Sequence, residues 1–173
     1  MIQPANHRFP YDGRVTTDLG ADAQLVVAFL NTFDVETRTD ELTTQEAWDA
    51  WSAAHRLPAA GPLATARAAR HALRAAAAGE GHADARRFAV DVLVGVIDGL
   101  PQTVAQDAAA AVLAAAARLA EAGRWSRIKL CASDTCRWAF VDESRNRSRT
   151  WCSMDVCGNR AKARSFRSRA RRP

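Results

Sequence analysis

Residues 131–157 read CASDTCRWAFVDESRNRSRTWCSMDVC, and the four cysteines in this stretch decide how the C-terminal part of the chain is interpreted. They form two C-x4-C pairs, Cys131 with Cys136 and Cys152 with Cys157. Each pair is short enough to chelate one ion, and four thiolates around Zn²⁺ leave no open coordination position. The pattern therefore predicts one structural zinc ion and not a catalytic one.

Three other roles for these cysteines stay open beside zinc. Two disulfides need an oxidising compartment, an iron–sulfur cluster usually has tighter cysteine runs, and buried free cysteines have no reason to be spaced so regularly. No stretch approaches the roughly 18 apolar residues of a membrane span, and Met1–Pro10 lacks the apolar core of a secretory signal. We therefore expect a cytoplasmic protein without membrane contact, in which zinc is favoured.

The residues around the cysteines predict a small finger. Trp138, Phe140 and Val141 alternate with polar residues, so a β-hairpin is expected between the two pairs, with the charged run 142–149 as its turn and 150–151 leading back. A basic helix should follow Cys157, with its N-terminus at the metal site. The turn that carries the first cysteine pair, residues 131–136, is called the knuckle. A knuckle, a hairpin and a helix that share one metal predict a treble-clef-like zinc finger.

The basic helix has two predicted faces. At about 100° per residue, Arg160, Arg164, Arg167 and Arg171 fall on one stripe. An apolar strip lies beside it, formed by Ala163, Phe166 and Ala170. We expect the helix to dock on the finger through this strip and to present its arginines outward.

Charge is divided unevenly along the chain. Residues 124–173 carry 14 Lys and Arg against 4 Asp and Glu, whereas residues 1–123 carry 10 against 15. An acidic body with a basic end is typical of nucleic-acid-binding proteins, and arginine suits phosphates and guanine edges because its planar fork donates two hydrogen bonds. The predicted nucleic-acid-binding residues are Arg145, Arg147, Arg149, Asn159, Arg160, Lys162, Arg164, Arg167, Arg169 and Arg171. The other possibility is a solvated basic tail without a partner.

The rest of the chain predicts a mainly α fold. Helical spacing of apolar residues begins at Asp22 and runs to Phe33; a second helix starts with a capping box of Thr43 and Glu46 and ends at Leu57-Pro58. A third helix starts at Pro62 and stops at Gly79, and an alanine-rich helix spans Val104–Glu121. Residues 88–97 fit strand or helix, with helix weakly preferred, and residues 98–101 read as a turn.

Composition changes at Gly123-Arg124-Trp125, where alanine gives way to arginine and cysteine. We therefore predict a helical domain over residues 1–124, through which the chain could form a homodimer, and a zinc-finger domain over residues 125–173.

Other polar residues carry weaker information. Asn31, Thr32 and Asp34 follow a helical apolar face and could line a pocket, although a helix end and loop is the preferred interpretation. The histidines, at positions 7, 55, 71 and 82, show no metal or nucleophile spacing and are expected at the surface. No phosphate-binding loop, dinucleotide fingerprint or catalytic triad pattern stands out, so no enzymatic activity is expected.

The C-terminal motifs resemble the CGNR zinc-finger proteins, also called ABATE-domain proteins. The matching residues are Arg127 to Cys131, Cys136 to Asp142, Ser144-Arg145, Trp151 to Met154, and Cys157-Gly158-Asn159-Arg160 with Lys162. Residues 25–51, with Phe29-Leu30-Asn31-Thr32, look like the start of that family's N-terminal domain, whereas residues 79–103 correspond least. The resemblance implies a helical N-terminal domain, four cysteine ligands, and a stress-induced bacterial transcription regulator that binds DNA.

Two hypotheses from different classes remain. In the first, residues 1–124 sense a signal or dimerise, and the arginine-rich helix binds DNA, or RNA, mainly through phosphates. In the second, the finger is a protein-interaction module that docks an acidic partner through Trp138 or Trp151.

Overall fold

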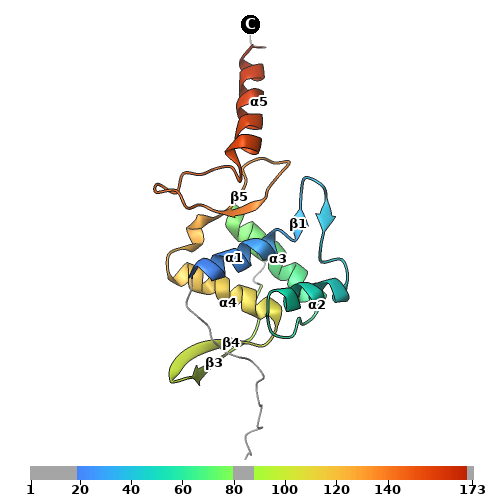
Figure 1. Ribbon diagram of the computed structural model, residues 1–173, viewed down its shortest axis with the longest axis vertical. Helices are drawn as coiled ribbons and strands as arrows, with labels where there is room; N and C mark the ends of the chain where they lie inside the picture. Colours follow the sequence, from blue (N-terminus) through green and yellow to red (C-terminus); the bar gives the residue numbers. More distant parts are fainter. Residues whose placement is uncertain (1–18, 80–87, 171–173) are drawn as a thin grey trace, which may run out of the picture.

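Four helices supply most of the hydrophobic core of this computed structural model, which describes residues 19–79 and 88–170 (Figure 1). They are α1 (Leu19–Leu30), α2 (Gln45–Ala54), α3 (Leu63–Ala78) and α4 (Ala108–Glu121). A fifth helix, α5 (Asn159–Ala170), projects from the rest of the molecule. The prediction of a mainly helical chain is confirmed, and the predicted loop over the first residues falls on 1–18, outside the described residues.

Among the described residues, three antiparallel hairpins complete the fold. They are β1 (Phe33–Asp34) with β2 (Thr39–Asp40), β3 (Val92–Ile97) with β4 (Leu100–Ala105), and β5 (Ile128–Leu130) with β6 (Ala139–Val141). A short 3₁₀ helix, η1 (Trp125–Arg127), precedes β5, and one π-helical turn, η2 (Met154–Gly158), precedes α5. Each hairpin has two strands, so the helices and not a sheet organise the core.

Small side chains let the helices approach closely. In α4 the buried face is largely alanine, for example Ala109 and Ala115, and it packs against Val26 and Phe29 of α1. Trp48 of α2 is fully buried, and its indole N–H donates to the carbonyl of Ala60 at 2.8 Å. This bond satisfies the one polar atom that such a large buried ring carries.

A buried ion pair joins the same helices. Asp22 is buried in α1, and Arg118 of α4 donates to both of its carboxylate oxygens at 2.8 and 2.6 Å. The acidic residue noted near the start of the first predicted helix therefore binds the neighbouring helix.

The predicted helix ends are partly correct. The third helix is confirmed, with Pro62 as its N-cap residue and Gly79 as its left-handed C-cap residue. The capping box is wrong by one residue, because Thr44 and not Thr43 accepts a hydrogen bond from the N–H of Ala47. That helix also ends at Ala54, before the predicted stop at Leu57-Pro58.

Phe33 is the last residue predicted for the first helix, but it lies in β1. The chain turns after Leu30, where the Thr32 hydroxyl donates to the carbonyl of Phe29 at 2.8 Å and occupies this acceptor at the end of the helix.

The weak preference for a helix over residues 88–97 is wrong. Residues 92–97 form β3, because their β-branched side chains suit an extended backbone that residues 100–105 pair with. Asp98 and Gly99, both with positive φ, make the two-residue turn, so Leu100 and Pro101 belong to the next strand. The alanine-rich helix consequently starts at Ala108, capped by Asp107, and not at Val104.

The β3–β4 hairpin leaves large apolar side chains in solvent, with Val94 79% and Val96 72% exposed. No helix among the described residues is long and apolar enough to cross a membrane. The main core extends into the C-terminal part through Ile128 and Ala139. The predicted boundary near residue 124 and the predicted homodimer stay predictions.

Candidate metal centre

The four cysteines converge on one point, as their spacing predicts. Their sulfur atoms all lie within 4.8 Å of one another, and none is in a disulfide. The Cys136–Cys152 and Cys152–Cys157 sulfur distances are 3.6 and 3.7 Å. A tetrahedron with Zn–S bonds of about 2.3 Å has sulfur–sulfur edges of about 3.8 Å. The cluster therefore fits a single zinc ion, and three of its four cysteines are buried.

The first pair of cysteines occupies the loop of the β5–β6 hairpin. The N–H of Cys131 donates to the carbonyl of Trp138, and the N–H groups of Cys136 and Arg137 both donate to the carbonyl of Ser133. Arg137 takes a left-handed backbone with φ of 53° to close this turn. These bonds turn both sulfur atoms toward the same side of the knuckle.

The hairpin was predicted between the two cysteine pairs, and this is wrong. Its strand β6 pairs with β5, which precedes Cys131, so that the hairpin encloses the first pair. The segment 142–151 is irregular, and the N–H of Ala132 between the first two cysteines donates to its Thr150 carbonyl.

The second pair lies where the chain enters α5. Cys157 is in η2, directly before the helix, so the prediction that the basic helix begins at the metal site is confirmed. The N–H of Gly158 donates back to the carbonyl of Ser153. A β-carbon on Gly158 would lie 2.7 Å from the sulfur of Met154, so a larger residue here would push that side chain away.

The pKa shifts of Cys131, Cys152 and Cys157 fit a cation at the centre of the cluster. Burial raises the pKa of Cys157 to about 11; the hydrogen bond with Cys152 opposes this rise, whereas Cys131 and Cys136 add to it. Burial, thiol hydrogen bonds and the charge of Cys131 likewise raise the pKa of Cys152. Burial also opposes ionisation of Cys131, but hydrogen bonds from the backbone of Cys152 and Ser133 outweigh it and lower that pKa. The Cys131 thiolate is therefore favoured, whereas a metal ion is needed to offset the charge when Cys152 and Cys157 ionise as well.

Asp142 organises the loop beside the cluster. Its carboxylate is fully buried and accepts from the Lys129 ammonium at 2.6 Å, from the hydroxyl and N–H of Ser144, and from the N–H of Arg149. Burial alone would raise the pKa of Asp142, but these bonds and the Lys129 charge lower it well below its usual value. The sequence pattern placed Asp142 in the charged turn of the predicted hairpin and did not indicate this role.

The predicted nucleic-acid-binding residues separate into groups. Asn159, Lys162, Arg164, Arg167 and Arg169 are exposed on α5, and Arg145 is exposed in the loop. Arg160, also exposed on α5, pairs with Glu36 of the β1–β2 loop at 2.8 Å. Arg147 donates to the hydroxyl of Ser126. Arg171 lies outside the described residues.

Arg149 has a structural position. Its guanidinium lies 4.9 Å from the centre of the Phe140 ring and donates to the carbonyls of Trp151 and Cys152. It therefore ties the loop to the second cysteine pair, and its fork has fewer donors left for a phosphate.

The predicted apolar strip on α5 does not dock. Phe166 is 69% exposed and Ala163 is also exposed. The helix instead projects from the rest of the molecule (Figure 1), and residues 162–167 and Arg169 are exposed.

The polar residues after α1 join the helical body to the finger. Asn31 donates to the carbonyl of Ala139 at 3.0 Å and accepts from its N–H at 2.7 Å. Asp34 caps the following turn through the N–H of Glu36, while Thr32 accepts from Arg70. His55 and His71 are exposed, as predicted, and His7 and His82 fall outside the described residues.

The comparisons with known proteins concern the C-terminal segment. No curated protein and no solved structure matches the chain. Residues 127–170 match the family model described as CGNR zinc finger, and all four clustered cysteines fall within this range. This segment of the chain therefore matches a CGNR zinc finger, and its four cysteines form a possible site for one zinc ion.

Proposed function

We propose that the protein is a DNA-binding transcription regulator in which one structural zinc ion fixes the base of an arginine-rich helix. The main support for this proposal is the position of α5. This helix starts at the cysteine cluster and extends away from the body (Figure 1), and its cationic side chains are exposed. A helix held only at its base can enter a groove of duplex DNA without a clash from the body.

The charge of α5 supports this assignment. Between Asn159 and Ala170 the helix carries five Lys and Arg and no carboxylate. Arg164 and Arg167 lie three residues apart and so share one face. Cations spaced in this way neutralise successive phosphates, and binding then weakens steeply as salt displaces the protein.

The test is a salt-titrated binding assay on a mixed-sequence duplex with the zinc-loaded chain. Arg164→Gln and Arg167→Gln should each weaken binding and lower the slope of log affinity against log salt by about one. Arg56→Gln removes the same charge from an exposed site after α2 and should leave both quantities unchanged. Equal affinity at low and physiological salt would contradict the proposal.

The second candidate function is a zinc-stabilised module that binds an acidic protein, and one observation favours it. Trp138, between the knuckle and β6, is 39% exposed, whereas Trp151 packs against the cysteine cluster. In that case Trp138→Ala would abolish binding of the acidic partner. Arg164→Gln and Arg167→Gln would leave DNA affinity equal to that of the wild type. RNA binding would appear as equal affinity for single-stranded RNA in the salt titration.

In this proposed role the zinc ion stabilises the finger and catalyses no reaction. Four thiolate ligands complete a tetrahedral shell and leave no position for a substrate. The knuckle in the β5–β6 hairpin and the helix after Cys157 would then form a treble-clef-like finger. We propose further that residues 1–124 sense a stress signal. The protein would act in the cytoplasm.

A further inference from the structure

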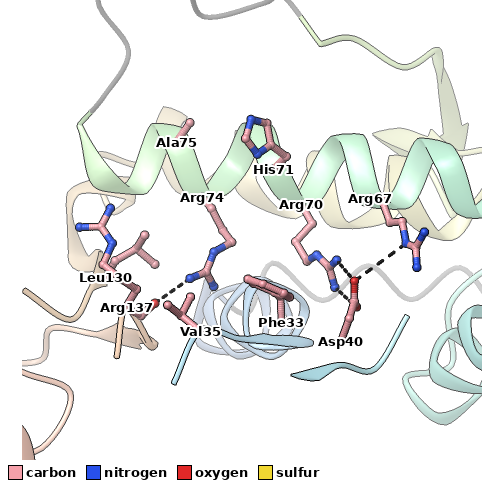
Figure 2. Close-up of a pocket in the computed structure, with 10 residues that line it drawn as sticks. All are labelled: Phe33, Val35, Asp40, Arg67, Arg70, His71, Arg74, Ala75, Leu130 and Arg137. Carbon is pink, nitrogen blue, oxygen red and sulfur yellow. Dashed lines mark hydrogen bonds and ion pairs between the residues drawn. The ribbon is translucent and has the colours of Figure 1, made fainter. Parts of the chain in front are cut away.

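A basic pocket of about 390 Å³ lies between α3, the β1–β2 hairpin and the knuckle (Figure 2). Four of its lining side chains are arginines: Arg67, Arg70, Arg74 and Arg137. Asp40 is the one carboxylate among the described residues that line it. The volume is in the range of small-molecule sites, and the lining carries an excess of positive charge.

Asp40 neutralises one of these arginines. Arg70 donates to both carboxylate oxygens of Asp40 at 2.7 Å, and its side chain is 8% exposed. Arg67 lies at 3.9 Å from the same carboxylate and is 45% exposed. The pair therefore anchors Arg70. Arg67 also donates to the carbonyls of Leu42 at 2.9 Å and Thr43 at 3.3 Å, which leaves part of its guanidinium fork for a ligand.

Arg74 is the cation that most needs a partner. Its guanidinium donates to the carbonyls of Leu30 at 2.7 Å and Arg137 at 2.9 Å, and it forms no ion pair within residues 19–79 and 88–170. Two bonds use two of its five donors. Burial and repulsion from Arg137 and Arg70 lower the pKa of Arg74 and outweigh the charge of Cys136, which raises it, so the neighbouring arginines oppose its charge. A half-buried charge without a counter-ion is costly, and an anion in the pocket would remove that cost.

The rest of the lining suits the organic part of a ligand. The ring of Phe33 lies 5.6 Å from the guanidinium of Arg70 and 6.0 Å from that of Arg74. Figure 2 shows the ring beneath these arginines, with Val35 beside Arg74. An apolar wall next to a cluster of forked donors matches a molecule with a carboxylate or phosphate at one end and an apolar body.

We propose that this pocket binds a small organic anion, a carboxylate or a phosphate monoester, through Arg74 and Arg67. The proposal does not depend on DNA binding. The pocket is nevertheless connected to the finger. Arg74 donates to the carbonyl of Arg137, which directly follows the predicted zinc ligand Cys136.

The experiment is calorimetric titration of the full zinc-loaded chain with phenyl phosphate and benzoate, with benzamide as the neutral analogue. Phenyl phosphate or benzoate should bind, and benzamide should bind at least about tenfold more weakly, because it cannot accept charge-assisted hydrogen bonds from the arginines. Arg74→Gln should weaken binding about tenfold or more, and Arg67→Gln several-fold. Arg56→Gln, outside the pocket, should bind like the wild type.

Several results would overturn the proposal. These are equal binding of benzamide, no binding of either anion, or an equal loss in Arg56→Gln. If Arg74→Gln fails to fold, judged by its zinc content and melting, unchanged binding in Arg67→Gln decides against the site. DNA is absent from every titration, so failure here is distinct from failure of the proposed DNA binding.

Discussion

Gly61 lies where neighbouring atoms leave no room for a side chain. It has a φ of +73°, and a β-carbon there would lie 2.7 Å from a carboxylate oxygen and 2.9 Å from the β-carbon of Asp107. Asp107 caps α4 by accepting from the N–H of Ala110 at 2.8 Å. Gly61→Ala therefore combines a left-handed alanine with a displaced cap, each worth about 1 kcal/mol. We expect the free energy of unfolding to fall by roughly 2 kcal/mol, measured by denaturant titration.

Gly79 provides the matched control for this prediction. Its φ is +72°, but a β-carbon added there would have no other atom within 4 Å among the described residues. Gly79→Ala should lose only the backbone contribution of about 1 kcal/mol. Equal losses in the two variants would mean that the contact with Asp107 does not matter.

At the scale of elements, the sequence predicts helices better than strands. The helix of residues 63–78 is bounded by Pro62 and Gly79, whose local geometry fixes its ends without help from the rest of the chain. The strand at 92–97 depends on pairing with 100–105, and its apolar residues also fit a helical period. The hairpin of the finger was misplaced for the same reason, because β6 pairs with residues before the first cysteine. Pairing across the chain is not encoded in local spacing.

The loop of residues 142–149 depends on one buried carboxylate. Asp142→Asn would place an amide donor against the Lys129 ammonium and the N–H of Arg149, which both donate to the same oxygen. We expect a loss on the order of 2 kcal/mol in unfolding free energy. Because folding lowers the pKa of Asp142, its carboxylate stabilises the folded state fully above its ordinary pKa of 3.8. This stabilisation is lost only as pH falls through the folded pKa. The loss should therefore be equal at pH 6 and pH 8, measured by guanidinium unfolding.

The neighbouring Glu143 is exposed and gives the control. Glu143→Gln should change the unfolding free energy by less than about 0.5 kcal/mol. A cost of Asp142→Asn that is no larger than this, or that differs between the two pH values, would contradict the buried ion pair.

At the scale of the whole molecule, the cysteine site was predictable and the basic pocket was not. Four cysteines in two regular pairs identify one another by residue type alone. The pocket combines Arg67, Arg70 and Arg74 with Asp40 and Arg137, which come from three distant segments. The spacing of the three α3 arginines did place them on one face, and this was the available indication. What lies opposite that face is decided by packing, which the pattern does not show.

Asn31 connects the helical body to the finger, so its substitution should affect the metal site at a distance. Its amide satisfies both backbone groups of Ala139, which is buried in β6 beside the knuckle. Asn31→Ala leaves an N–H and a carbonyl unpaired in the core, at a cost of about 1–3 kcal/mol. Since β6 follows Cys136 by three residues, a loosened strand should also let zinc pass faster to a colorimetric chelator.

The exposed Asn146, in the loop, supplies the comparison, and Asn146→Ala should keep the wild-type stability and transfer rate. The two readouts separate two arrangements of the molecule. If the body and the finger form one cooperative unit, Asn31→Ala loses stability and releases zinc faster together. If zinc transfer stays at the wild-type rate while stability falls, the finger holds its metal without the body, and the bond to Ala139 joins two independent units.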